Sequence, residues 1–484
     1  MTQQTGSGTQ STSLRRVLVP LALAQFICSF AGSSMNVMIN DISEDLDTTV
    51  QGVQSAITIF LLVMAALMIP GGKLTDRYGR KRCFALGLVV YGVGALISAL
   101  SPGLGVLIIG NSILEGVGTA LLIPPVYILA TMLFTDLTSR ARAFGVISAM
   151  GGVGAAAGPL IGGLITTAIS WRAVFIFQAV IIAVIVWLAR GIKDPLPADP
   201  TRRFDVLGTI LSATGLILVV MGILAADNNG WLMVILIVSG AVVLTLFFLS
   251  LRAKERAGKE PLLSTALFRN RTSNLGLVTQ NTQWLLLMGV SFVVSAYLQV
   301  VRGYNAIQTG VIFTAATVGI LVSSLAAERL AKRYPQRSLI IAGFVVTIVG
   351  VGVLLAMVTG NPSNWAFAPG LLLIGLGLGG MLTPSVNVVQ SSFTEDQQGE
   401  ISGLSRCVSN LGSSLGAAIA GTILVAGITS TPSRAYGLAM ITLAAIAVIG
   451  LAAAFLLPRN LSVATSAASI QHDRSEAERD PSTS

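Results

Sequence analysis

Long apolar runs alternate with short polar segments along almost the whole chain. A transmembrane helix needs about 20 consecutive, mostly apolar residues, and fourteen runs meet this criterion. The predicted spans are 17–39, 52–71, 83–101, 105–131, 143–166, 171–190, 205–226, 230–251, 274–300, 306–327, 338–358, 365–389, 402–427 and 435–457. The pattern therefore predicts an all-α polytopic membrane protein with 14 transmembrane helices.

The composition supports a membrane protein and excludes several other classes. The 484 residues are 53% hydrophobic and only 11% charged, against about 25% charged in a typical soluble protein. The three cysteines and the single histidine, His472, show no metal-ligand spacing. We therefore expect no enzyme, no nucleic-acid partner, no metal and no cofactor. The Ser/Thr/Gln-rich or charged ends, 1–13 and 458–484, are expected to be disordered tails.

The basic residues predict the orientation of the chain in the membrane. With an even number of spans, both termini share one side with alternate loops, and 27 of the 30 lysines and arginines fall on that side when the segment 390–406 is counted as a loop. Only Arg172, Arg302 and Arg434 fall on the other side. Because cytoplasmic loops are enriched in Lys and Arg, both termini are expected to be cytoplasmic, in a plasma (inner) membrane protein.

The chain also contains an internal repeat. GKLTDRYGRK (72–81) is echoed by ERLAKRYPQR (328–337), GAAAGPLIGG (154–163) by GSSLGAAIAG (412–421), and LEGVGTALLIPP (114–125) by LIGLGLGGMLTP (373–384). The offsets of 256, 258 and 259 residues predict two six-helix pseudo-repeat bundles, 14–190 and 274–457, with two extra central helices inserted at 205–251. Duplicated halves around a midplane site are typical of secondary transporters.

Two of these motifs resemble those of a known family. The first, with Gly72, Asp76, Arg77, Gly79, Arg80 and Lys81, is similar to the loop signature between helices 2 and 3 of the major facilitator superfamily. The second, with Gly154, Gly158, Pro159, Gly162 and Gly163, resembles the helix-5 motif associated with antiporters. Together with the span count, the resemblance indicates the fourteen-helix drug:proton antiporter branch.

Each motif has a physical interpretation. Asp76 at a helix end can accept hydrogen bonds from neighbouring arginines, so this gating loop would hold the cytoplasmic side shut in one state and release it in another. The alternative is that the charges only set topology. The glycines and Pro159 give the second motif a smooth, bendable face, which serves either coupling or simple close packing.

One acidic residue lies far inside a predicted span. Glu115 is ten residues from the start of its run, about 15 Å deep at 1.5 Å per residue. An intramembrane carboxyl group is a functional hypothesis by default, and we expect Glu115 to couple transport to protons. The alternative is a permanently neutral Glu bonded to a neighbouring helix. Relatives commonly carry an arginine where this chain has Ser112 and an aspartate where it has Ala31. Transport without proton coupling, by an uncoupled facilitator, is therefore an alternative.

Neutral polar and aromatic residues complete the expected substrate cavity: Asn36, Asn111, Gln280, Asn281, Gln283, Trp284, Asn387 and Gln390. Such a lining suits a lipophilic or cationic molecule, whereas an anion would call for arginines. For each amide alone, bonding between helices is the competing interpretation.

We therefore expect multidrug-type efflux of a small-molecule substrate by proton antiport through alternating access. The protein is expected to be a monomer in the lipid bilayer. Export of an endogenous lipid or secondary metabolite is the closest alternative. Nutrient uptake and a role as a non-transporting scaffold or sensor are the remaining alternatives.

Overall fold

The computed structural model describes residues 6–134, 137–192, 194, 204–226, 229–331, 333–356, 364–393 and 397–459. Every regular element in these ranges is a helix. Thirteen helices are long and apolar enough to cross a membrane, or fourteen when a bent pair of helical segments is counted as one span. The predicted all-α polytopic membrane fold is confirmed.

The helices of the first half match the first six predicted spans. They are α1 (Gly6–Ser34), η1 (Met35–Met38), α2 (Ile39–Asp45), α3 (Val50–Tyr78), α4 (Arg80–Ala99), α5 (Leu104–Leu107), η2 (Ile108–Glu115), α6 (Gly116–Leu133), α7 (Leu137–Ala168) and α8 (Trp171–Ala189). The short elements continue their long neighbours, so that 17–45 and 104–130 each form one span.

The two helices predicted as an insert and the helices of the predicted second half also match their predicted spans. The insert is α9 (Val206–Leu224) and α10 (Gly230–Arg256), followed by the short helix η3 (Thr265–Arg269). The second half comprises α11 (Arg271–Ala296), η4 (Tyr297–Val301), α12 (Ala306–Ala331), α13 (Gln336–Ala356), η6 (Asn364–Ala366), α14 (Phe367–Gln390), α15 (Gln398–Val425) and α16 (Pro432–Phe455).

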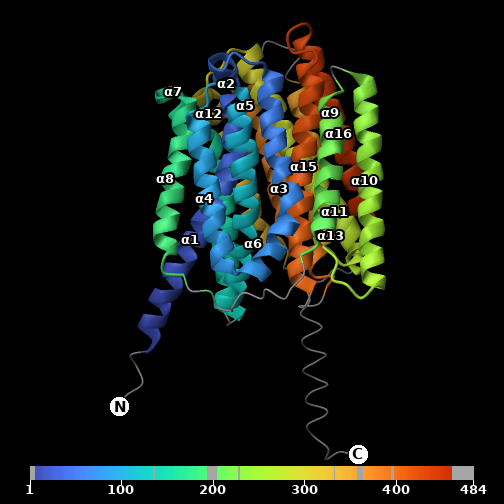
Figure 1. Ribbon diagram of the computed structural model, residues 1–484. Helices are drawn as coiled ribbons and strands as arrows, with labels where there is room; N and C mark the ends of the chain where they lie inside the picture. The colour runs from blue at the N-terminus through green and yellow to red at the C-terminus, as the bar shows by residue number, and fades with distance from the viewer. Residues whose placement is uncertain are drawn as a thin grey trace, which may run out of the picture.

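The long helices alternate in direction, so α1 begins and α16 finishes at the same end of the bundle (Figure 1). We call this the basic end, because Lys73, Arg77, Arg80 and Lys81 lie there at the α3–α4 turn. α1 begins at Gly6, so residues 6–13 of the expected N-terminal tail are helical. Residues 1–5 and 460–484, which hold the rest of the two expected tails, lie outside the described residues.

Most helix packing takes place within each half. α1 packs on α7 and α4 on α6 and α8, while α11 packs on α15 and α12 on α14. The halves meet along two main seams, α3 against α15 and α7 against α12. These seams join helices that lie far apart in the sequence.

The two inserted helices lie beside one of these seams. α9 and α10 pack on each other, and α9 also contacts both α3 and α15. Val220 and Leu224 of α9 form a small apolar cluster with Leu62 of α3 and Ala418 of α15. α10 presents exposed apolar side chains such as Ile235 and Val238 on its outer surface, as a lipid-facing helix requires. The insert therefore covers the α3–α15 seam on its lipid side.

Candidate functional site between the two halves

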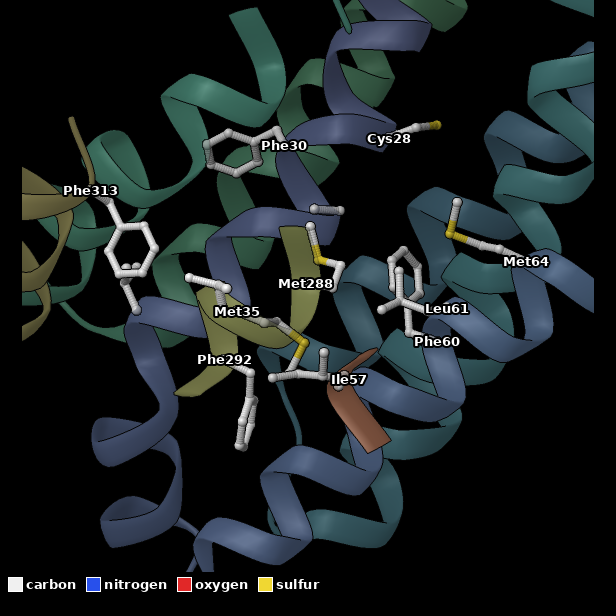
Figure 2. Close-up of a cluster of buried hydrophobic side chains, with 14 of the residues drawn as sticks. Cys28, Phe30, Met35, Ile57, Phe60, Leu61, Met64, Met288, Phe292 and Phe313 are labelled. Carbon is white, nitrogen blue, oxygen red and sulfur yellow. The ribbon is translucent and has the colours of Figure 1, made fainter. Parts of the chain in front are cut away.

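Apolar side chains from both halves lie together in one buried cluster (Figure 2). Phe30 and Met35 come from the first half, as do Ile57, Phe60, Leu61 and Met64 of α3, whereas Met288 and Phe292 of α11 and Phe313 of α12 come from the second half. We call these nine residues the central cluster. Methionine and aromatic side chains adapt to apolar surfaces of different shape, so the cluster is chemically suited to lipophilic molecules.

At the end opposite the basic end, glycine lets the two halves approach very closely along the α7–α12 seam. A Cβ on Gly163 would lie 2.9 Å from the carbonyl carbon of Ala306, and a Cβ on Gly310 would lie 2.9 Å from that of Pro159. Neither glycine therefore tolerates a side chain in this arrangement. The Thr167 hydroxyl also accepts a hydrogen bond from the backbone N–H of Ile307 at 3.1 Å.

The antiporter-type motif of α7 has two contact faces. Gly154, Gly158 and Gly162 pack on Phe26, Ser33 and Ser34 of α1, within the first half, whereas Gly163 and Pro159 face the second half. The helix bends by 41° between 145–155 and 157–168. Proline at 159 removes the hydrogen bond to the carbonyl of residue 155, which accounts for a bend at this place.

The gating loop at the basic end forms a tight turn with its own ion pair. Gly79 has a φ of 96°, a conformation that favours glycine. Arg80 Nη2 lies 3.4 Å from Asp76 Oδ1, so the expected pairing of Asp76 with a neighbouring arginine is present. The backbone N–H of Lys81 donates to Asp194 at 3.1 Å, and Arg77 lies over the Tyr78 ring.

A different ion pair links the two halves at this end. Lys73 Nζ of α3 lies 2.7 Å from Glu400 Oε1 of α15, and the other Glu400 oxygen accepts a hydrogen bond from the Ser264 backbone N–H at 3.3 Å. Neither Lys73 nor Glu400 was identified from the sequence. Within the first half, Gly71 lets α3 approach α6 closely, because its Cβ would meet the Ala120 backbone, whereas a Cβ on Gly72 would meet only Pro124, at 3.8 Å.

Glu115 is completely buried inside the first half. It ends the π-helical segment η2, and its Oε1 accepts a hydrogen bond from Ser98 at 3.3 Å. The Tyr91 hydroxyl lies beside the carboxyl group and donates to Gln178 at 2.6 Å. Within the described residues, Oε2 has no hydrogen-bond partner. The carboxyl group therefore lies against α4, beside Ser98 and Tyr91.

The two positions that depart from the family pattern are also buried. Ser112 donates to the Ala56 carbonyl of α3 at 2.7 Å, and Ala31 is 2% exposed. Neither position holds a charged side chain, so Glu115 is the acidic group of the first half at this depth among the described residues.

Several predicted cavity amides hold helices together. Gln280 donates to Ser409 at 2.8 Å, Asn281 to the Val408 carbonyl at 2.9 Å, and Gln283 to the Leu378 carbonyl at 3.0 Å. All three bonds stay within the second half. They match the competing interpretation given above.

The other predicted cavity residues are dispersed. The Asn36 carbonyl accepts from Gln299 at 2.8 Å across the halves, and Asn111 contacts the Met35 sulfur at 3.0 Å. Gln390 donates to Ser402 at 3.3 Å, while Trp284 and Asn387 are half-buried. The structure does not bring these residues together into one polar cavity.

One arginine lies in the interface between the halves. Arg406 is in α15, eight residues after its start at Gln398; the predicted span 402–427 already included it, so counting it with the preceding loop was wrong. Its guanidinium donates to the Tyr127 hydroxyl of α6 and lies 4.7 Å from the centre of the Tyr127 ring. Tyr127 in turn donates to Gln25 of α1 at 3.2 Å. The sequence feature that could have identified Arg406 is a basic residue inside the predicted span 402–427.

Comparisons with known proteins agree with this arrangement. The family model described as Major Facilitator Superfamily matches residues 21–268, 198–417 and 278–477. Two of these ranges begin 257 residues apart, the offset of the internal repeat. The chain therefore belongs to the major facilitator superfamily and is a multi-pass membrane transporter of small molecules, not an enzyme.

Several relatives are named as drug-resistance or efflux proteins. The puromycin resistance protein pur8 of Streptomyces alboniger is 30% identical over 84% of this chain and 81% of its own length. The multidrug efflux pump LfrA of Mycolicibacterium smegmatis is 27% identical over 84% and 80%. A crystal structure of a POT family transporter superposes with a TM-score of 0.67 at 15% identity, covering 90% of this chain and 95% of the other, which supports the fold alone.

Proposed function

We propose that this chain exports lipophilic small molecules across the plasma membrane in exchange for protons, with both termini in the cytoplasm. The observation that carries the proposal is the central cluster, which is apolar and built from both halves (Figure 2). A site shared between two halves opens to one side or the other as the halves rock. The relatedness to pur8 and LfrA supports efflux of drug-like compounds.

The contacts between the halves support alternating access. At the end opposite the basic end, glycine–carbonyl contacts close the α7–α12 seam. At the basic end, the Lys73–Glu400 pair links α3 to α15. Exposed ion pairs are weak, whereas glycine packing is lost as soon as the backbones separate. We propose that the gating loop and this ion pair close the cytoplasmic side, and that the glycine contacts close the outer side.

Glu115 is proposed as the proton carrier. A buried carboxylate with one oxygen left without a hydrogen bond is costly, so the site suits the protonated form, and release of the proton requires a change in the surroundings. Within the described residues, Glu115 Oε2 has no hydrogen-bond partner. Tyr91 and Ser98, both of α4, lie beside the carboxyl group. A shift of α4 or of the wide turn η2 during rocking would change these contacts. Such π-helical turns are frequent at functional sites.

Proteoliposomes test the proposal. Efflux of a fluorescent lipophilic dye is measured with and without an imposed pH gradient, for the wild type, Glu115→Gln and Ser101→Ala. Ser101 is a buried serine two residues after the end of α4, and it donates to the Ser98 carbonyl rather than to Glu115, so its variant is the control. We expect the gradient to accelerate efflux in the wild type and the control, but not in Glu115→Gln.

Each alternative has its own outcome. Dye efflux that ignores the gradient in the wild type indicates an uncoupled facilitator. A Glu115→Gln variant with unchanged pH dependence removes Glu115 from the coupling mechanism, leaving export itself. Absence of dye transport, with transport of extracted lipid or secondary metabolites, favours an endogenous substrate. Absence of any transport favours the scaffold or sensor alternative.

A further inference from the structure

The contact between Arg406 and Tyr127 joins the two halves. α6 and α15 are not among the main packed helix pairs in the described part of the chain, yet the Arg406 guanidinium reaches the Tyr127 hydroxyl and ring. Arg406 itself is partly exposed. Because Arg406 belongs to the second half and Tyr127 to the first, this bridge links the halves through a helix pair other than the two main seams.

The bridge is placed between the basic end and the central cluster. Along α15, Arg406 lies six residues after Glu400, which pairs with Lys73, and eight residues before Ser414, which donates to the Thr58 carbonyl. At 1.5 Å per residue these separations are about 9 Å and 12 Å. Arg406 therefore lies at a depth between the basic end and the central cluster.

The charge of Arg406 is not compensated by an acidic side chain. Among the residues that the structure describes, Arg406 contacts Tyr127 and pairs with no acidic side chain, and Tyr127 donates to the neutral amide of Gln25. Arginine stays charged in proteins and carries five N–H donors. A hydroxyl group and a ring face satisfy only part of this capacity. An intramembrane charge in such a position marks a ligand pathway.

We propose that Arg406 binds the acidic group of the transported molecule, which selects lipophilic anions over cations. This inference rests on the proposed export function and specifies its substrate class: the anionic group contacts the guanidinium, and the apolar body lies toward Met64 and the rest of the central cluster. The planar guanidinium suits bidentate binding of a carboxylate. The expectation of a cationic substrate rested on a cavity without arginines, and Arg406 removes that basis.

A matched pair of dyes tests the inference. A rhodamine with a free carboxylate and the methyl ester of the same dye differ in the acidic group alone. Their binding to the purified protein in phosphatidylcholine nanodiscs is measured by fluorescence anisotropy. Hydrogen bonds to charged groups contribute about 1.5–3 kcal/mol, so we expect the carboxylate dye to bind at least about tenfold more tightly than the ester. Arg406→Gln should remove this preference, and Arg406→Lys should reduce it.

The control variant is Arg434→Gln, because Arg434 is an exposed arginine of α16 at the opposite end. It should keep the full preference. The inference is overturned if the wild type does not prefer the carboxylate, if neither dye binds, or if Arg406→Lys and Arg406→Gln keep the preference. If Arg406→Gln fails to fold, the wild type and Arg406→Lys still decide the question.

Two further arms separate other causes. Nanodiscs that contain phosphatidylglycerol show whether a lipid headgroup takes the place of the substrate: if they abolish the preference of the wild type, the site binds lipid and the inference is wrong. Transport of the ester driven by a pH gradient tests the export function separately. Transport without a carboxylate preference contradicts this inference alone, whereas a preference without transport contradicts the proposed function alone.

Discussion

The close contact between Gly163 of α7 and the Ala306 carbonyl predicts that a single methyl group will open the end opposite the basic end. A Cβ at this position would lie 2.9 Å from the carbonyl carbon and nearer still to the oxygen. Because ordinary carbon contacts begin at about 3.5 Å, Gly163→Ala must separate the seam by roughly 0.6 Å. Overpacking of this kind costs about 1–3 kcal/mol.

The helix itself gains from the same substitution, since alanine is favoured over glycine by up to about 1 kcal/mol. The net cost to the closed arrangement is therefore up to about 2 kcal/mol, which shifts a two-state equilibrium by up to about 30-fold. The expected result is a larger population in which the two halves are separated at this end. Gly152→Ala is the control on the same helix, because its Cβ would meet nothing within 4 Å.

Spin labels attached through Ile169→Cys and Asn305→Cys measure this separation by double electron–electron resonance. Both positions are exposed and lie at this end, one in each half. Gly163→Ala should add a longer-distance population, whereas Gly152→Ala should leave the distribution unchanged and raise thermal stability slightly. If the two variants give the same distribution, the reasoning from the glycine–carbonyl contact is refuted.

Three further results are expected. Because the Lys73–Glu400 pair links the halves, Lys73→Glu should slow transport in a dye-efflux assay, and the double variant Lys73→Glu/Glu400→Lys should restore it. Equal rates for the single and double variants would contradict this. Asp205 is buried, pairs with Lys254 and accepts from the Leu262 backbone N–H, so Asp205→Ala should lower stability by about 3 kcal/mol, measured as a lower melting temperature and faster proteolysis near residues 257–264. Tyr91→Phe should shift the pH dependence of dye efflux, because the Tyr91 hydroxyl lies beside Glu115, and an unchanged pH profile would show that this hydroxyl takes no part in coupling.

The membrane-spanning segments could be predicted because a single constraint governs them. In a bilayer the backbone must satisfy its own hydrogen bonds, so every long apolar run becomes a helix, and each predicted run overlaps one observed traversal. The place of the insert could not be predicted: only the packing of Val220 and Leu224 on Leu62 and Ala418 shows that α9 covers the α3–α15 seam.

The site was harder to predict, since its contacts join residues far apart in the chain. Lys73 and Glu400 are 327 residues apart, and no local pattern indicates that they meet. Gln280 and Gln283 were predicted to line a cavity, with bonds between helices as the alternative, and the sequence does not distinguish the two. Arg406 was counted with a loop although it lies inside the predicted span 402–427, and its helix starts eight residues before it.

The most direct test of proton-coupled export is the reverse of the efflux experiment. In proteoliposomes without an imposed pH gradient, a gradient of the carboxylate dye is applied and the luminal pH is followed with a trapped indicator. Because coupling between two ligands is reciprocal, dye movement in one direction should drive proton movement in the other in the wild type, and not in Glu115→Gln. Dye transport at a normal rate with no change in luminal pH would contradict the account.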